Sequence, residues 1–512
     1  MREKLESLSL AVLKELAKEK KIKRSSSMKK QELVEALLLA STEEDEAATV
    51  SSKKEKSEEK SDKTDKAKKT AGSKKADDAE KTEKAKKTEK SEKPVKSEKP
   101  EKTDKSEKHE KHDKRKNKKA DEEEGKSAEG SEEAVETEPF KPVDGILEVL
   151  TDGYGFVRCE NYLPGSDDVY VSPAQIRKLN LKTGDIIKGT TKRNNANDKF
   201  GALQMIESVN GYSVEDAIRR PSFENLTPIF PDKRIHLERA NSSVAMRIVD
   251  LISPIGKGQR GMIVSQPKAG KTTLLKEIAK SVKESNPDMH IIILLIDERP
   301  EEVTDIKEAI QGKNAEVIYS TFDELPEHHK RVSEMVIERA KRLVEHKQDV
   351  MILLDSITRL SRAYNLTVPP SGRTLSGGLD PAALHMPKRF FGAARNMREG
   401  GSLTILATAL VETGSKMDDV VFEEFKGTGN MELVLDRKLS EKRVFPAIDI
   451  AKSGTRREDK LLTDDELRAV DIMRKGMNGM RSDEAVENIL NLFARTKSNA
   501  DVVAQVGKRR ML

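Results

Sequence analysis

The chain has 512 residues, 36% of them charged, and a net charge of only +5, so its length allows about three or four domains while its charge content argues that part of it is unfolded. Its one cysteine, Cys159, excludes an intrachain disulfide and a thiolate metal cluster and fits a reducing compartment. No apolar run reaches the ~20 residues of a membrane span, and the first residues carry charges where a signal peptide needs an apolar core, so we expect a cytoplasmic protein without a membrane segment.

Residues 1–42 predict a small helical leader. Leucine and valine recur at helical spacing in two sets, which are separated by the basic run KEKKIKRSSSMKK. A leucine-rich helix pair with lysines between its helices suits a minor nucleic-acid contact or a packing module, and the residues favour neither.

Residues 43–139 predict a disordered, charged insert. Val95 is the only Val, Ile, Leu, Met, Cys or aromatic residue between Val50 and Val135, so apolar burial cannot offset the entropy of folding. The charge is divided into blocks: residues 53–119 carry 27 Lys and Arg against 17 acids, a net +10, and residues 121–138 carry one Lys against nine acids, a net −8. The basic block suits a loose polyanion-binding arm for which the acidic block competes, and a solvated spacer explains the composition equally well.

Residues 140–212 predict a small β-barrel. Short β-like runs alternate with turn signals in the order GILEVL, DGYGFVR, DDVYVS, DIIKGTT and ALQMIESV. Five short strands in under seventy residues are typical of an oligonucleotide-binding (OB) fold of the cold-shock-like kind.

One strand of this barrel carries a pattern suited to single-stranded nucleic acid. In DGYGFVR, Tyr154, Phe156 and Arg158 are two residues apart and so share one face, and stacking of a base on such an aromatic is worth ~1–3 kcal/mol. Candidates to extend this platform are Tyr170, Arg177, Lys178 and Phe200. The alternative is that the aromatics form the barrel's own core.

Residues 213–240, with three prolines, are expected to be a linker, and residues 241–512 an α/β domain organised around SQPKAGKT. An apolar run precedes this stretch and a helical pattern follows it, which is typical of a phosphate-binding loop, although Ser265 replaces the first glycine; an ordinary turn is the alternative. The candidate nucleotide contacts are Ser265, Gln266, Pro267, Lys268, Ala269, Gly270, Lys271, Thr272 and Thr273.

Two carboxylates follow strands predicted downstream of this loop. Apolar runs at 291–296, 350–354 and 403–407, separated by helical stretches, predict a parallel sheet covered on both faces, in which ligands bind at the carboxyl ends of the strands. Asp355 and Thr272 suit the Mg²⁺ of bound ATP, and Glu298 suits the orientation or deprotonation of an attacking water. Either carboxylate alone is also compatible with a helix cap.

A series of motifs runs through the large domain: QPKAGKT, LLIDERPEEVTD, LLDSITRLSRAYN, GGLDPAALHMPKRFFGAARN, TGSKMDD, EEFKGTGNMEL, EKRVFPAIDI and SGTRRED. In this order they resemble the bacterial transcription termination factor Rho family, whose ATPase domain is RecA-like, and the resemblance covers about residues 140–512. The leader is similar to that family's helical leader. The charged insert departs from the family's shortest members, so the resemblance assigns it no role.

The resemblance implies a homohexameric, RNA-dependent ATPase and helicase that uses ATP and Mg²⁺, moves 5′ to 3′ along nascent RNA and releases it from RNA polymerase. Lys268, Lys271 and Thr272 would contact the nucleotide. Arg456 would be an arginine finger that enters a neighbouring subunit's site, and Arg443 would assist it.

The resemblance also implies two RNA sites. The primary site, on the barrel, prefers pyrimidines, especially cytosine, and would consist of Tyr154, Phe156, Arg158, Asp168, Tyr170 and Arg177. The second would line the central hole of the ring. It would be formed by the Gly-rich loop at 371–380, which includes Arg373, Gly377 and Gly378, and by the loop around Lys416.

Two other classes of function are alternatives to this one. A rotary or secretion-type hexameric ATPase shares the nucleotide fold but has no barrel with DGYGFVR. A binding module with an inert ATP site does not need Lys271, Glu298, Asp355 and Arg456, all of which are present.

Overall fold

The computed structural model describes residues 13, 30–31, 140–193, 199–477 and 479–508. The chain divides into two units, Met1–Gly125 and Lys126–Leu512, each of which is described by itself. In the first unit Leu13 is helical and buried, and residues 30 and 31 are helical. The rest of the predicted leader and all of the predicted disordered insert at 43–139 lie outside the described part.

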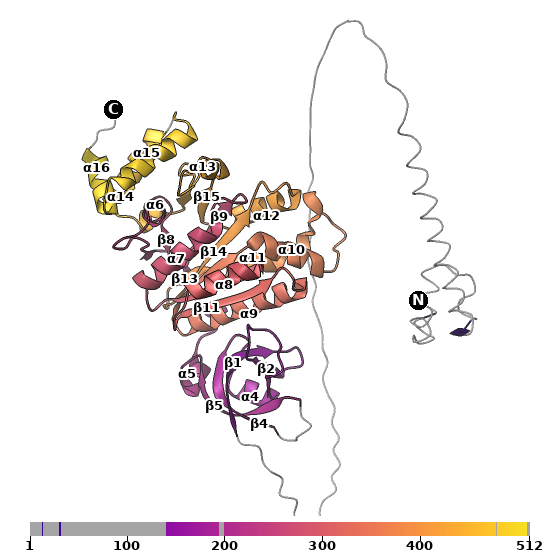
Figure 1. Ribbon diagram of the computed structural model, residues 1–512. Coiled ribbons are helices and arrows are strands. Elements are labelled where there is room, and N and C mark those ends of the chain that lie inside the picture. Colours follow the sequence, from indigo (N-terminus) through magenta and orange to yellow (C-terminus); the bar gives the residue numbers. More distant parts are fainter. Residues whose placement is uncertain (1–12, 14–29, 32–139, 194–198, 478, 509–512) are drawn as a thin grey trace, which may run out of the picture. The chain divides into compact units, whose positions relative to one another are not determined.

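The second unit begins with a closed barrel, drawn in purple in Figure 1, whose strand order is β1-β2-β3-β5-β4. Its elements are β1 (Lys141–Val149), β2 (Gly155–Arg158), β3 (Val169–Val171), α4 (Pro173–Lys178), β4 (Ile186–Lys192) and β5 (Gly201–Val209). The parallel pairing of β3 with β5 closes a barrel whose other pairs are antiparallel. The five predicted strands are confirmed.

Short elements follow the barrel where a linker was expected: α5 (Val214–Arg219), the 3-10 helix η1 (Phe223–Asn225), β6 (Pro228–Ile229) and β7 (Arg234–Ile235). β6 pairs with β13 (Arg395–Met397) of the large sheet, and β7 pairs with β8 (Ile255–Gly256). This segment is therefore bound to the large domain by strand pairing.

The large domain is built on a sheet of order β11-β10-β12-β14-β9-β15-β16. Its strands are β9 (Arg260–Ser265), β10 (His290–Glu298), β11 (Ala315–Thr321), β12 (Asp349–Asp355), β14 (Ser402–Leu410), β15 (Met431–Leu435) and β16 (Gly454–Thr455). All pairs from β11 to β15 are parallel, as predicted, but β16, β13 and β6 join antiparallel, so the sheet is mixed. For β13 the reason is local, because a tight turn leads directly into β14 and leaves no room for the crossover that a parallel neighbour needs.

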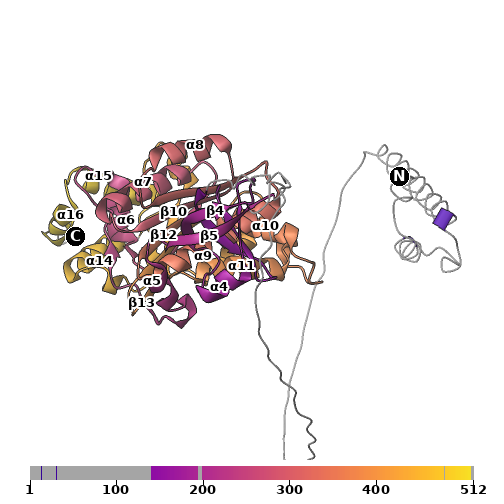
Figure 2. The same ribbon diagram turned by 90° about the horizontal axis from the view of Figure 1, so that it is seen from below.

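Two hydrophobic cores cover the two faces of this sheet. Along β10, Ile291, Ile293 and Leu295 enter one core, and the intervening Ile292 and Leu294 enter the other. Figure 2 shows helices on both sides of the strands. The first face is covered by α6 (Val244–Ile252), α7 (Lys271–Ser285), α8 (Pro300–Ala309), α14 (Asp464–Met477), α15 (Ser482–Ala494) and α16 (Asn499–Lys508), and the second by α9 (Pro326–Glu345), α10 (Ile357–Thr367), α11 (His385–Gly392) and α12 (Lys416–Lys426).

The barrel is joined to α9 by buried charges. Arg220 donates to Asp185 of the barrel at 2.6 Å and to Glu345 of α9 at 2.8 Å, and all three side chains are almost fully buried. The backbone comes so close here that a Cβ on Gly184, whose φ is +94°, would lie 2.4 Å from the carbonyl carbon of Glu338. In the part of the chain that the structure describes, no helix is both long and apolar enough to cross a bilayer.

Candidate functional site

The predicted phosphate loop connects β9 to α7. Gly270 begins α7 with φ +92° and no side-chain cap, and the first turn of the helix contains no acidic residue. Its first N–H groups therefore point out of the helix end without a side-chain acceptor, which favours an anion there. The loop is held at its other end by Gln266, which bonds to Glu412 at 2.5 Å and accepts from the Arg437 N–H at 2.9 Å.

The two predicted strand-end carboxylates meet the loop lysine. Lys271 Nζ lies 2.5 Å from Asp355 Oδ1 and 3.6 Å from Glu298 Oε1. Burial and the neighbouring Asp355 charge raise the pKa of Glu298 to about 7. Glu298 is therefore matched to proton exchange near neutral pH, and the sheet brings together the three residues that the sequence predicted at this site.

Three further residues of this site were missed from the sequence. Glu302, on the first turn of α8, accepts from Thr272 Oγ1 at 3.2 Å. Arg359 of α10 contacts Glu298 at 3.0 Å, and Thr408 at the end of β14 donates to Asp355 at 2.8 Å. The signal for Thr408 was present, since it follows the third apolar run, but α8 and α10 reach the site only through the tertiary fold.

A largely apolar cavity of about 410 Å³ lies beside the phosphate loop and was also missed. Phe445 is 57% exposed, and with Pro446 it lines the cavity together with Gly270 and Thr273. An exposed aromatic ring beside a phosphate loop is suited to stack on a flat heterocycle such as a nucleobase. The sequence signal was the aromatic residue next to a proline in EKRVFPAIDI.

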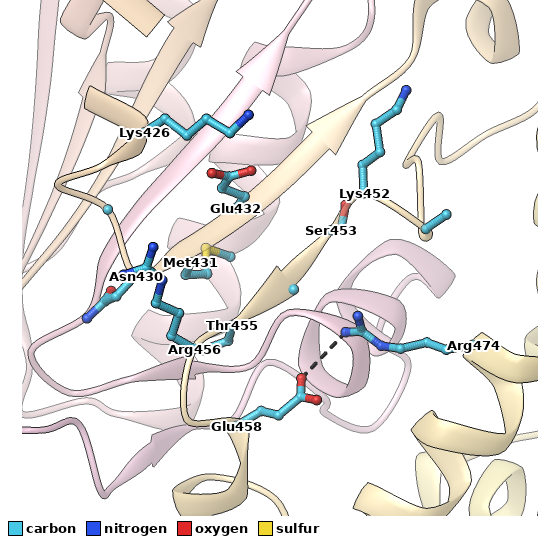
Figure 3. A pocket seen from close by; sticks show the side chains of 13 residues that line it. Lys426, Asn430, Met431, Glu432, Lys452, Ser453, Thr455, Arg456, Glu458 and Arg474 are labelled. Carbon is cyan, nitrogen blue, oxygen red and sulfur yellow. Dashed lines mark hydrogen bonds and ion pairs between the residues drawn. The ribbon is translucent and has the colours of Figure 1, made fainter. Parts of the chain in front are cut away.

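Arg456 lies at the opposite end of the sheet from its own phosphate loop. Arg456 directly follows Thr455 of β16. Thr455 pairs with Met431 of β15, which in turn pairs with Gly261 of β9. The phosphate loop begins after Ser265, which is about 13 Å further along β9. Figure 3 shows Arg456 beside Asn430 in a cavity of about 280 Å³ that also holds the Arg474–Glu458 ion pair.

Arg443 lies elsewhere. It is exposed, with φ +62°, and follows α13 (Arg437–Glu441), whose Ser440 donates to the Lys268 carbonyl of the phosphate loop at 3.2 Å. The structure therefore does not bring Arg443 and Arg456 together within one chain.

The two loops predicted to grip RNA are in contact. Gly377, with φ +78°, approaches α12 so closely that a Cβ would lie 2.5 Å from the Met417 nitrogen, one residue after Lys416. Arg373, Gly378 and Lys416 are exposed.

Helix α10 connects these loops to the carboxylates. It begins directly after Asp355 and Ser356. Its Arg362 binds Asp418 of α12 at 2.5 Å, and its Asn365 accepts from the Asp380 N–H at 2.8 Å. Contacts therefore run from both loops to the helix that starts at the ATP site.

On the barrel, four aromatic rings form a cluster outside the core. Tyr154, Phe156 and Tyr170 have mutual centroid distances of 5.8 to 6.0 Å, and Phe200 lies 5.2 Å from Phe156. All four are partly exposed, and among the described residues the barrel core is made of aliphatic side chains such as Val157. The alternative that these rings are the core is therefore wrong.

Arg158 and Asp168 lie next to this cluster, and both are buried. If Arg158 simply continued the aromatic face of the strand, its side chain would be exposed. The Arg158 guanidinium carbon is 4.9 Å from the Phe156 centroid, and its Nη1 donates to Asp168. The reason is that Asp168 and Glu148 flank the guanidinium and draw it inward. Arg177 and Lys178 are exposed in the last turn of α4, and among the described residues neither makes a cation–π contact with the rings.

Comparison with known proteins gives three family models. They are the Rho termination factor N-terminal domain over residues 4–46, the Rho termination factor RNA-binding domain over 143–215 and the ATP synthase alpha/beta family nucleotide-binding domain over 245–455. Transcription termination factor Rho of Pseudomonas aeruginosa is 57% identical over 361 residues, which are 70% of this chain and 85% of that protein. The Bacillus subtilis protein of the same name is 54% identical over 72% of this chain and 85% of its own length.

A solved structure of a prototypical ATPase from the type III secretion system of pathogenic bacteria is also similar. It covers 55% of this chain and 86% of its own at 23% identity, with a TM-score of 0.46. A likeness of this size carries no argument for the rotary or secretion-type alternative.

Proposed function

Because the chain belongs to the transcription termination factor Rho family, we propose that it is an ATP-driven RNA translocase and helicase that moves along nascent RNA and releases it from RNA polymerase. It would work as a homohexameric ring in the cytoplasm. The observation that supports this most is that one chain holds both a phosphate loop flanked by strand-end carboxylates and a solvent-facing aromatic cluster on a barrel.

The ATP site has the donors that Mg·ATP needs. Asp355 Oδ2 is buried with no hydrogen-bond partner among the described residues, and the Thr272 hydroxyl is turned towards the neighbouring Glu302. Mg²⁺ prefers such oxygen ligands, few in number and completed by phosphates and water. When bound, the ion would neutralise charge on the phosphates.

The chain's own residues would do the rest of the chemistry. Lys271 would exchange its carboxylate partner for phosphate oxygens, and Glu298, with a pKa near 7, would orient the attacking water and take its proton. Arg456, distant from its own phosphate loop, would place its guanidinium in a neighbour's site. Phe445 would stack on the adenine.

The barrel would read cytosine through Arg158 and Asp168. Asp168 Oδ1 is buried without a hydrogen-bond partner among the described residues, and so is ready to accept from a ligand. Cytosine offers an amino donor on its Watson–Crick edge next to acceptors, whereas uracil presents a carbonyl oxygen where that donor stands. A cytosine stacked on the rings would satisfy Asp168, and a uracil would place an oxygen against it.

ATP turnover measured with and without poly(C) tests this function. We expect strong stimulation by poly(C), loss of that stimulation in Lys416→Ala, and release of the transcript from a stalled RNA polymerase complex only when ATP is hydrolysed. Turnover that is fast and independent of RNA would instead favour the rotary class. Binding of RNA with no turnover under any condition would favour the inert binding module.

A further inference from the structure

One carboxylate ties the barrel's base-reading pair to the ATPase domain. Glu148 Oε2 accepts from Arg158 Nε at 2.7 Å and lies 2.7 Å from Arg158 Nη2. The same oxygen accepts from Nη2 of Arg331, on α9, at 2.7 Å. The charges therefore alternate along a line from α9 to the aromatic cluster: Arg331, Glu148, Arg158, Asp168.

This arrangement determines which edge of Arg158 is available to a ligand. A guanidinium has five N–H donors in a fixed plane. Glu148 occupies the Nε/Nη2 edge and Asp168 binds Nη1, so a hydrogen on each of Nη1 and Nη2 stays free for a base. If Glu148 turned away, the guanidinium could rotate about its stem and present another edge, and the free Oδ1 of Asp168 would lose its fixed neighbour.

Within the barrel, Arg158 is the ion-pair partner of Glu148 among the described residues. The Glu148 side chain is 14% exposed, and it lies at the end of β1 just before the turn into β2. The contact that holds its carboxylate from the far side comes from Arg331, whose side chain is 35% exposed. A carboxylate shared by two guanidiniums has less rotational freedom than one held by a single partner.

We propose that Arg331 of the ATPase domain is a specificity-determining residue of the barrel's RNA site, acting through Glu148 to hold Arg158 and Asp168 in the orientation that selects cytosine. The inference rests on the proposed base-reading role of Arg158 and Asp168. It implies that the base preference is a property of the barrel docked on α9, and not of the barrel strands alone.

A purely structural role for Arg331 is the competing explanation. The joint between barrel and α9 has other, more deeply buried contacts, namely Arg220 with Asp185 and Glu345, and Lys182 with Glu345 at 3.1 Å. Loss of the partly exposed Arg331 pair therefore leaves the joint intact. Lys182 supplies a matched control, because it too crosses the joint to a carboxylate of α9 but has no contact with Glu148 or Arg158 among the described residues.

The test measures dissociation constants of short oligo(C) and oligo(U) for the full chain. For Arg331→Gln we expect the ratio that favours oligo(C) to fall about threefold to fivefold, the range that a partly exposed ion pair supports, mainly through weaker oligo(C) binding. Arg331→Lys should recover part of the ratio. Lys182→Gln should leave it unchanged, and thermal unfolding of each variant monitors the fold.

A double-mutant cycle separates positioning from general stability. In the Glu148→Gln background, Arg331→Gln should have no further effect on the ratio, because its action passes through that carboxylate. An unchanged ratio in Arg331→Gln, an equal fall in Lys182→Gln, or full additivity in the cycle would overturn the inference while leaving the RNA-motor function in place. A wild-type chain that binds oligo(C) and oligo(U) equally would instead refute the proposed cytosine reading, and this inference with it.

Discussion

The barrel site and the ATP site each hold a cation between two carboxylates, but they use different cations. In the barrel, Arg158 is fixed on two edges by Glu148 and Asp168. In the ATPase domain, Lys271 lies against Asp355 and within 3.6 Å of Glu298. The planar guanidinium still has N–H donors with fixed directions after both carboxylates are bound, which suits hydrogen bonding to the edge of a neutral base. The ammonium is a point charge, so it can exchange a carboxylate for a phosphate. The arginine of the barrel is therefore suited to recognise the hydrogen-bonding edge of a base, and the lysine of the ATP site is suited to recognise the charge of a phosphate.

The largest effect expected from this contrast is the loss of ATP hydrolysis in the Lys271→Ala variant. Removal of the ammonium leaves the developing phosphate charge unopposed, so ATP hydrolysis should be abolished. Oligo(C) binding to the barrel should stay within about twofold of wild type, since the aromatic cluster has no contact with Lys271; this is measured by fluorescence anisotropy of labelled oligo(C) alongside phosphate release. Equal loss of both would mean that the two sites do not act separately.

Arg456→Ala tests whether the ATP site is complete within one chain. Arginine fingers contribute about 10³-fold or more to turnover, so the pure variant should be nearly inactive. When variant and wild-type subunits are mixed before assembly, turnover should fall by more than dilution, because each finger serves a neighbour. Lys452→Ala, an exposed neighbour whose ammonium pairs with Asp449 instead, is the control. A strictly proportional loss in the Arg456→Ala mixture contradicts action between subunits.

Tyr154→Ala together with Phe156→Ala tests the barrel side of the comparison. Each lost stacking contact is worth ~1–3 kcal/mol, so oligo(C) binding should weaken by about that much or more, while turnover without RNA should not change. Lys416→Ala serves as the reverse control: short oligo(C) should bind it normally, and RNA-stimulated turnover should fall. If both variants impair oligo(C) binding equally, the primary and secondary RNA sites are not distinct.

The smallest expected effect concerns pH at the joint between the two domains. His346 stacks on Tyr212 with ring centroids 4.2 Å apart, and burial together with the nearby Arg220 lowers the pKa of His346 from 6.5 to about 4. His346 therefore takes up a proton more readily in the unfolded chain than in the folded chain. The contribution of neutral, buried His346 to the free energy of unfolding is complete above pH 6.5 and is lost as the pH falls towards 4.

Thermal unfolding at a series of pH values checks this expectation. His346→Gln, which cannot take up a proton, should have a melting temperature that declines less between about pH 6.5 and pH 5 than that of wild type. Wild-type and variant curves that run parallel over this range would show that His346 does not carry the pH dependence.

Much of both sites could be predicted because their determinants are local. The phosphate loop lies between one strand and one helix, so Gly270, Lys271 and Thr272 are placed by a few consecutive residues. The shared face of Tyr154 and Phe156 follows from the two-residue period of a strand, and the alternating cores along β10 follow from a continuous apolar run.

What could not be predicted depends on how side chains from different elements meet in space. Burial of Arg158 required Asp168 and Glu148 to close around it, and Glu302 and Arg359 reach the ATP site from helices whose packing angles no local pattern specifies. The pairing of Arg331 with Glu148 spans 183 residues. Sequence by itself determined the strands of the barrel and of the parallel sheet and the candidate residues of both sites, because those depend on periodicity and residue type. Only the tertiary structure decided which carboxylate each cation meets, because an ion pair depends on the position of two side chains in space and not on their separation along the chain.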